Sequence, residues 1–174
     1  MSILLCDSLS KSCIHSYLPY YSLSYSSEYP YGGIGIFRNF LGGIDCTLTH
    51  VINPGGAWGI FSTFPRALVL SRIIVVSMLL YYVIKTPMHF WRKLSLIAIF
   101  SGAVGNILDY FIYGHVIDMI HFSFWGLSFP VFNLADLSIC FGCLSIFIIY
   151  LTNKQTTTAS VSYTHLTLPT SDLV

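Results

Sequence analysis

Residues 101–136 read SGAVGNILDYFIYGHVIDMIHFSFWGLSFPVFNLAD, and this stretch carries most of the chain's chemically informative residues. Three of the seven acidic residues of the chain lie in it, at or beside strongly apolar segments: Asp109, Asp118 and Asp136. An ionised carboxyl group at membrane depth costs several kcal/mol unless it faces a cavity or a partner. Each of the three is therefore a candidate functional residue.

The same stretch contains a repeated Asn-x-x-Asp pattern, in which Asn106 precedes Asp109 and Asn133 precedes Asp136. Residues three apart on a helix share a face, so we expect each amide to donate to the carboxylate of its own pair. Carboxyl groups held by amides where water is restricted suit acid–base activation of a water molecule. The pattern therefore indicates acid–base chemistry.

The composition is typical of an integral membrane protein. Apolar residues make up 55% of the chain, charged residues make up 9%, and the mean hydropathy is +0.72. A soluble domain usually carries about 25% charged residues. The formal net charge of +1 argues against a nucleic-acid-binding surface. We expect one domain over residues 1–154, and we interpret the Thr- and Ser-rich residues 155–174 as a disordered or artefactual tail.

Hydropathy predicts membrane-spanning helices at about 1–20, 67–84, 94–113 and 131–151. The first stretch is interrupted by polar residues, so we expect a first helix whose beginning is missing. Lys85, Arg92 and Lys93 bracket the short loop between the second and third helices, and the positive-inside rule places that loop in the cytoplasm. Residues 20–65 and 115–130 are then expected outside.

The region between the first two helices is too polar to cross a bilayer. Residues 20–43 are rich in Tyr, Ser and Gly, and residues 44–53 alternate Thr and Val roughly as a strand does. In the second helix, Arg72 either extends to the membrane interface or pairs with an active-site acid. Cys140 and Cys143 form a CxxC inside an apolar helix, where we interpret them as packing residues; no metal site is predicted.

Three ordered blocks carry a family resemblance. GAVGNILD with GHVID (residues 102–118) and FPVFNLAD (residues 129–136) resemble the two signature blocks of the lipoprotein signal peptidases (signal peptidase II), which are membrane aspartyl proteases. NPGGAWG at residues 53–59 resembles a third block of that family. The resemblance implies an all-α membrane protein with a small β element. This would be a four-helix transmembrane bundle, its first helix truncated, with an extramembrane β-cradle between helices 1 and 2.

The resemblance also implies the roles of individual residues. Asp118 and Asp136 would be the catalytic dyad, one carboxyl acting as general base on water and the other, protonated, polarising the scissile carbonyl. The residues expected to bind substrate or orient the dyad are Asn53, Asn106, Asp109, Asn133, Asp7 and Lys11. Asn53 could equally cap the turn before Pro54, and Asp7 with Lys11 could be a coincidental polar pair. The family usually has Arg after the residue matched by Asp109, and Tyr110 stands there instead, which weakens any salt bridge normally made at that point.

The implied reaction is hydrolysis of the peptide bond before a diacylglyceryl-modified cysteine, with neither metal nor cofactor. The implied location is the bacterial cytoplasmic (inner) membrane, with several passes and the site toward the outer face. The expected partners are a lipid-modified prolipoprotein and membrane lipid, not nucleic acid, and we expect a monomer.

Two other classes of membrane protein fit the sequence less well. A small four-helix transporter would favour repeats between its halves, and the sequence shows none. A non-enzymatic membrane scaffold would not explain the two Asn-x-x-Asp pairs. The Gly-x-Gly-Asp motif of presenilin-type aspartyl proteases is also absent from the sequence.

Overall fold

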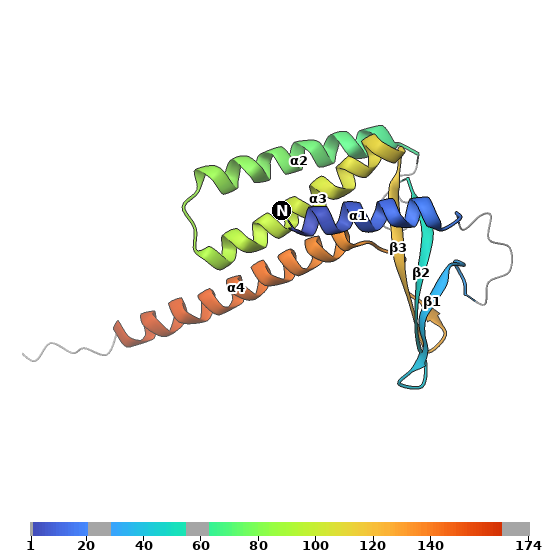
Figure 1. Ribbon diagram of the computed structural model, residues 1–174. Coiled ribbons are helices and arrows are strands. Elements are labelled where there is room, and N and C mark those ends of the chain that lie inside the picture. The colour runs from blue at the N-terminus through green and yellow to red at the C-terminus, as the bar shows by residue number, and fades with distance from the viewer. Residues whose placement is uncertain (1, 21–28, 55–62, 165–174) are drawn as a thin grey trace, which may run out of the picture.

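The computed structural model describes the backbone of residues 2–20, 29–54 and 63–164, and the side chains of these ranges up to residue 152. The helices are α1 (Ser2–Tyr17), α2 (Pro65–Lys85), α3 (Phe90–Tyr113) and α4 (Leu134–Thr164). The strands are β1 (Ile34–Phe40), β2 (Ile44–Asn53), β3 (Val116–Phe124) and β4 (Leu127–Ser128). Packed helices form one part of the molecule, and the sheet runs across one end of them (Figure 1).

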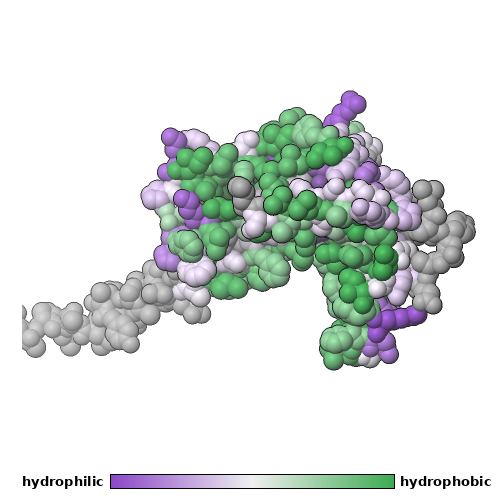
Figure 2. Space-filling view, in the orientation of Figure 1, coloured by the Kyte–Doolittle hydropathy of each residue, from purple (hydrophilic) through white to green (hydrophobic). Residues whose placement is uncertain are grey.

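Three helices are long and apolar enough to cross a membrane: α2, α3 and the Leu134–Thr152 part of α4. They confirm the spans predicted at 67–84, 94–113 and 131–151, with ends that shift by a few residues. Figure 2 shows apolar side chains over much of the visible helical surface. Helix α4 continues to Thr164, so the backbone is helical for ten residues beyond the predicted domain end at 154. Residues 165–174 of the predicted tail lie outside the described residues.

Helix α1 is the shortest of the four, with 16 residues. This length falls below the roughly 20 residues that span a bilayer. Its buried residues are Asp7, Lys11 and Ile14, so the polar pair faces α3 and α4 rather than the outer surface of the bundle.

Local sequence explains where these helices begin and end. Pro65 occupies the first position of α2, where its missing N–H costs nothing. Gly114 ends α3 in the left-handed conformation, with φ 80°, and its N–H donates to the carbonyl oxygen of Tyr110 at 2.9 Å. This turn directs the chain out of the helical bundle and into β3.

The sheet has the order β1-β2-β3-β4, with every neighbouring pair antiparallel. The strand predicted over residues 44–53 is β2. The sheet is larger than expected, because β3 and β4 come from residues 115–130, which we had expected to form only an outer connection. Strand β1 lies in the region that we had described only as polar. The central strands β2 and β3 pair from Ile44 with Phe124 to Asn53 with Val116, so the sheet joins residues 44–53 to residues 116–124.

Helices α3 and α4 approach each other closely at small residues. A methyl group at Gly102 would overlap the carbonyl oxygen of Ala135, and one at Gly105 would lie 2.9 Å from a carboxyl oxygen of Asp7 and in van der Waals contact with the Ala135 methyl group, 3.4 Å away. Ser138 donates from its hydroxyl to the carbonyl oxygen of Ala98, 2.8 Å away, which links the two helices directly. Small residues at such crossings allow the two backbones to come close.

Replacing Gly102 with Ala tests this close approach. In an ordinary helix the change gains up to about 1 kcal/mol of helix propensity. Here we expect the folded protein to lose roughly 1–3 kcal/mol, because the added methyl group overpacks the α3–α4 contact. The measurement is the thermal unfolding midpoint in detergent, with Ser77→Ala on the exposed face of α2 as the control. A midpoint that rises in the Gly102 variant would contradict the packing.

Candidate active site

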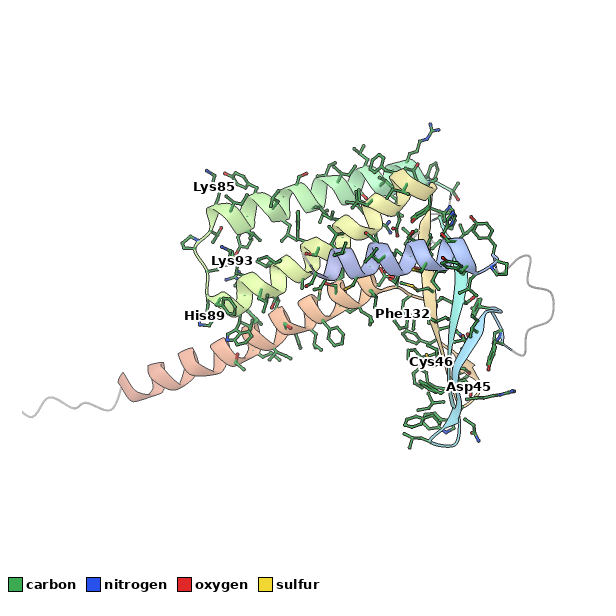
Figure 3. The ribbon with its side chains drawn as sticks, in the orientation of Figure 1. Asp45, Cys46, Lys85, His89, Lys93 and Phe132 are labelled. Carbon is green, nitrogen blue, oxygen red and sulfur yellow. The ribbon has the colours of Figure 1, made fainter. Side chains whose placement is uncertain are left out.

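The polar residues singled out in the sequence meet where the sheet joins the helices. Asp118 lies in β3, and Asp136 lies in the first turn of α4. The other members come from the end of β2, from α3, from the residue before α4 and from α1: Asn53, Asn106, Asp109, Asn133, Asp7 and Lys11. In Figure 3 the Lys85–Lys93 loop lies at the opposite end of the helices from the sheet. The site therefore sits at the end of the bundle away from the basic loop.

Asp118 is buried and held by two amides. Its side chain is 3% exposed. Asn53 donates to one carboxyl oxygen at 2.9 Å, and Asn133 donates to the other at 2.8 Å. Burial and the nearby charge of Asp136 raise the pKa of Asp118 to about 7, although both amide hydrogen bonds act to lower it. This carboxyl group can therefore hold a proton near neutral pH.

Asp136 is half-buried and takes part in the start of α4. The backbone N–H of Asp136 donates to the side-chain oxygen of Asn133 at 2.9 Å, and the backbone N–H of Asn133 lies 3.4 Å from an Asp136 carboxyl oxygen. This reciprocal pair is a capping box, which satisfies the free N–H groups of a helix end. The positive end of the helix dipole also favours the ionised carboxylate there.

The side-chain NH2 groups of Asn106 and Asn133 do not donate to the carboxylates of their own pairs, so that part of the expectation was wrong. Asn106 donates to Asp136 at 2.8 Å. The side-chain nitrogen of Asn133 donates toward Asp118 and toward the side-chain oxygen of Asn106, which is 3.2 Å away. The physical reason is that Asn133 precedes α4, so its side chain does not share a helical face with Asp136. The close approach of α3 and α4 brings the two pairs together instead.

Lys11 forms a second polar cluster beside the first. Its ammonium group is fully buried and lies 2.6 Å from a carboxyl oxygen of Asp7, 2.6 Å from one of Asp109 and 3.1 Å from the side-chain oxygen of Asn106. Three acceptors match the three hydrogens of an ammonium group. The other carboxyl oxygen of Asp7 accepts from the backbone N–H of Ala135 at 2.9 Å, so α1 also helps to cap α4.

Asp109 finds its cation on another helix. Tyr110 cannot supply a positive charge, and the ion pair of Asp109 is made with Lys11 of α1. In the described structure Asp109 belongs to the Lys11 cluster, and Asn106 connects that cluster to Asp136.

Arg72 of α2 interacts electrostatically with both Asp118 and Asp136. No ion pair within 4 Å joins it to an acid in the described part of the chain. It therefore adds positive potential at the site without holding either carboxyl group. The sequence left open whether Arg72 extends to the membrane interface or pairs with an active-site acid. The structure shows an electrostatic interaction with both acids but no direct ion pair.

The structure describes only the first two residues of the block at 53–59. Asn53 contacts Asp118, while Gly55, Gly56 and Gly59 of its block lie outside the described residues. Within the described residues no group of three or more His, Cys, Asp or Glu side chains is placed to hold a metal ion.

The sequence analysis also missed that β3 carries Asp118, although the alternation of Ile120, Phe122 and Phe124 with polar residues was a usable signal.

Replacing Lys11 with Met tests the buried cluster. Removing one partner leaves Asp7 and Asp109 without their cation, which costs roughly 3–5 kcal/mol for a buried pair. We expect the thermal unfolding midpoint in detergent to fall sharply. A triple variant with Asp7→Asn, Lys11→Met and Asp109→Asn removes all three charges and should recover most of that loss. If the Lys11→Met variant were as stable as the parent protein, the cluster would contribute little to the stability of the fold.

The chain is similar to known proteins in both sequence and fold. The family model described as signal peptidase (SPase) II matches residues 1–152. The lipoprotein signal peptidase of Chlamydia pneumoniae is 34% identical over 124 residues, covering 70% of this chain and 74% of its own. That of Clostridium acetobutylicum is 37% identical over 128 residues, covering 70% and 79%. A solved structure described as a bacterial membrane enzyme superposes with a TM-score of 0.70 at 26% identity, covering 88% of this chain and 85% of its own. The chain therefore belongs to the signal peptidase II family, the lipoprotein signal peptidases of bacterial membranes.

Proposed function

We propose that this lipoprotein signal peptidase is an aspartic endopeptidase whose catalytic dyad is Asp118 and Asp136. The observation that carries the proposal is the amide network: Asn133 donates to Asp118 at 2.8 Å, and Asn106 donates to Asp136 at 2.8 Å. The contact between the two amides, at 3.2 Å, fixes one carboxyl group relative to the other. Two carboxyl groups held this way suit acid–base activation of water.

The environments of the two carboxyl groups support different roles. Asp118 is the more buried, and its pKa of about 7 favours the protonated form that can donate to a scissile carbonyl oxygen. Asp136 lies at the N-terminus of α4, where the helix dipole favours a carboxylate that can act as a base. Two like charges this close do not both ionise readily, so the pair holds one proton in its working form.

The reaction then needs only the dyad and water. Asp136 removes a proton from water as the water oxygen bonds to the scissile carbon, and Asp118 donates its proton to the carbonyl oxygen. In the tetrahedral diol that results, Asp136 returns its proton to the amide nitrogen. The C–N bond breaks as one hydroxyl group of the diol gives its proton to the Asp118 carboxylate. That hydroxyl oxygen becomes the carbonyl oxygen of the new carboxylic acid. Each carboxyl group ends in the state in which it began.

The substrate and orientation are part of the same proposal. Lys85 and Lys93 lie at the far end of the bundle (Figure 3), and Arg92 directly precedes Lys93 in the first turn of α3. The positive-inside rule then puts the dyad near the outer face of the cytoplasmic membrane. A prolipoprotein whose cysteine carries a diacylglyceryl group would present its cleavage point at that depth. The lipid chains would lie against the apolar helices, and the extended signal-peptide end would lie against the sheet.

The extent of the domain, the oligomeric state and the cofactor requirement belong to the same proposal. Residues 1–154 act as one peptidase domain, and the protein works as a monomer with membrane lipid around it. It needs neither a metal nor an organic cofactor, because the dyad supplies both the acid and the base.

Replacing either carboxyl group tests the roles. Asp118→Asn and Asp136→Asn should each lower kcat/KM by about 10²–10⁴-fold, the usual contribution of a general acid or base. The measurement is mass spectrometry of a diacylglyceryl-modified precursor incubated with each purified variant. Asp45→Asn, on the far side of the sheet, is the matched control and should retain activity. Normal turnover by either dyad variant would rule out the proposed aspartic mechanism.

The pH dependence gives a second test. Activity requires one proton on the dyad, so kcat/KM should fall at high pH as Asp118 loses its proton, with a midpoint of about 7, and should fall again in acid as the base is protonated. Asn53→Ala removes a hydrogen bond that lowers the pKa of Asp118, so its alkaline limb should move to higher pH. Ile52→Ala, at the exposed neighbouring residue, should leave that limb in place. An alkaline limb that is the same in the parent and the Asn53 variant would contradict the assignment of Asp118 as the acid.

A further inference from the structure

The two faces of the sheet carry different kinds of side chain. Paired residues of an antiparallel sheet project on the same face, and successive residues alternate. The register therefore gathers large apolar side chains from all four strands on one face. We call the following residues the apolar sheet face: Phe37, Phe40, Ile44, Phe122, Phe124 and Leu127. The intervening pairs, Asp45 with Ser123 and Ser123 with Ser128, place polar groups on the other face.

The apolar sheet face points toward the side on which the helices lie. In Figure 3, Cys46 and Phe132 lie on the helix side of the sheet, and Asp45 lies on the opposite side. Cys46 pairs with Phe122, so it shares this face. The ring of Phe132, just before α4, stacks on that of Phe122 with centroids 6.1 Å apart and an interplanar angle of 13°.

The far part of this face extends past the helices. The sheet runs across the helix ends and continues beyond them (Figure 1). Near the helices, Leu48 and Ile120 pack against the buried core around Ile117. Farther out, Phe40 is 56% exposed and Leu127 is 77% exposed, so the described elements leave these side chains uncovered.

The position of the helices says what lies against this uncovered part. If α2, α3 and α4 cross the bilayer, the space beside them on the helix side of the sheet is lipid. In Figure 2, apolar side chains continue from the helices onto the part of the sheet that projects beyond them. The two turns at the far end of the sheet carry exposed Leu41 and Trp125. Trp is enriched at the depth of lipid headgroups.

We infer that the apolar sheet face is a membrane-contacting surface that rests in the interfacial layer of the outer leaflet. The opposite face, which carries Asp45 and Ser128, is turned away from the membrane. Strand β3 carries both Asp118 and two residues of this face, Phe122 and Phe124, so contact with lipid sets the depth at which Asp118 is held. This inference requires the membrane orientation but not the catalytic roles, so inactive dyad variants remain valid for testing it.

Adjacent residues of β4 provide a matched test. Leu127 and Ser128 are both exposed and lie on opposite faces. In full-length protein with its five cysteines replaced by alanine, Leu127→Cys or Ser128→Cys would carry a nitroxide label. The protein is reconstituted in vesicles of phosphatidylethanolamine and phosphatidylglycerol. Power saturation compares collisions with oxygen, which concentrates in lipid, and with a nickel chelate, which stays in water.

We expect the ratio of oxygen to nickel accessibility to be several-fold higher at position 127 than at position 128. Equal ratios that favour nickel at both positions would overturn the inference. Dipolar broadening between labels at position 127 would also overturn it, because a second copy of the chain would then cover this face.

A second measurement keeps the native cysteines, in case their replacement impairs folding. With Trp58→Phe and Trp91→Phe, Trp125 is the remaining tryptophan of the chain. Lipids with brominated acyl chains should quench its fluorescence. Adding Phe40→Asp and Leu127→Asp should reduce that quenching. Absence of quenching in the parent would contradict the membrane contact.

Discussion

A single buried amide, the side chain of Asn133, holds the two carboxyl groups of the site in one arrangement. Its oxygen caps α4 by accepting from the backbone N–H of Asp136, and its nitrogen donates to Asp118 of β3. The side chain is fully buried, so water does not compete for either end. Because an amide is planar, a rotation that improves one of these bonds worsens the other. Strand β3 and the start of α4 are therefore held at a fixed offset, and the geometry of the dyad follows from it.

The Lys11 cluster determines which way the neighbouring amide points. Burying an ammonium group with two carboxylates is not by itself a source of stability, since well-packed apolar residues often do as well or better. Its contact with Asn106 gives the cluster another consequence. The ammonium group attracts the oxygen of that amide at 3.1 Å, which leaves the nitrogen to donate to Asp136 at 2.8 Å. A reversed amide would place its oxygen against the carboxylate. The charge on α1 thereby orients a hydrogen bond at the dyad without touching it.

The parts of this structure that were predicted from the sequence are those that depend on local composition. Apolar length identified three spanning helices, and acids in apolar segments identified Asp109, Asp118 and Asp136 as candidates. The binding of Asn106 to Asp136 was not predictable, because it depends on how closely α3 and α4 approach at Gly102 and Gly105. Strand β3 was overlooked for a different reason. Its aromatic residues also suit a membrane interface, and that interpretation concealed their alternation with polar residues.

The two carboxyl groups of the proposed dyad belong to parts of the chain that, in our proposal, contact the membrane separately. The depth of Asp136 follows from the apolar span of α4, which begins two residues before it at Leu134. The depth of Asp118 follows from the sheet, whose apolar face lies on the leaflet surface in our proposal. These depths agree only if the sheet lies across the helix ends, and the left-handed Gly114 at the end of α3 directs the chain that way. A substrate anchored by its own lipid meets the same reference plane. On this view the bilayer sets the depth of the base on α4, of the acid on β3 and of the peptide bond that lies between them.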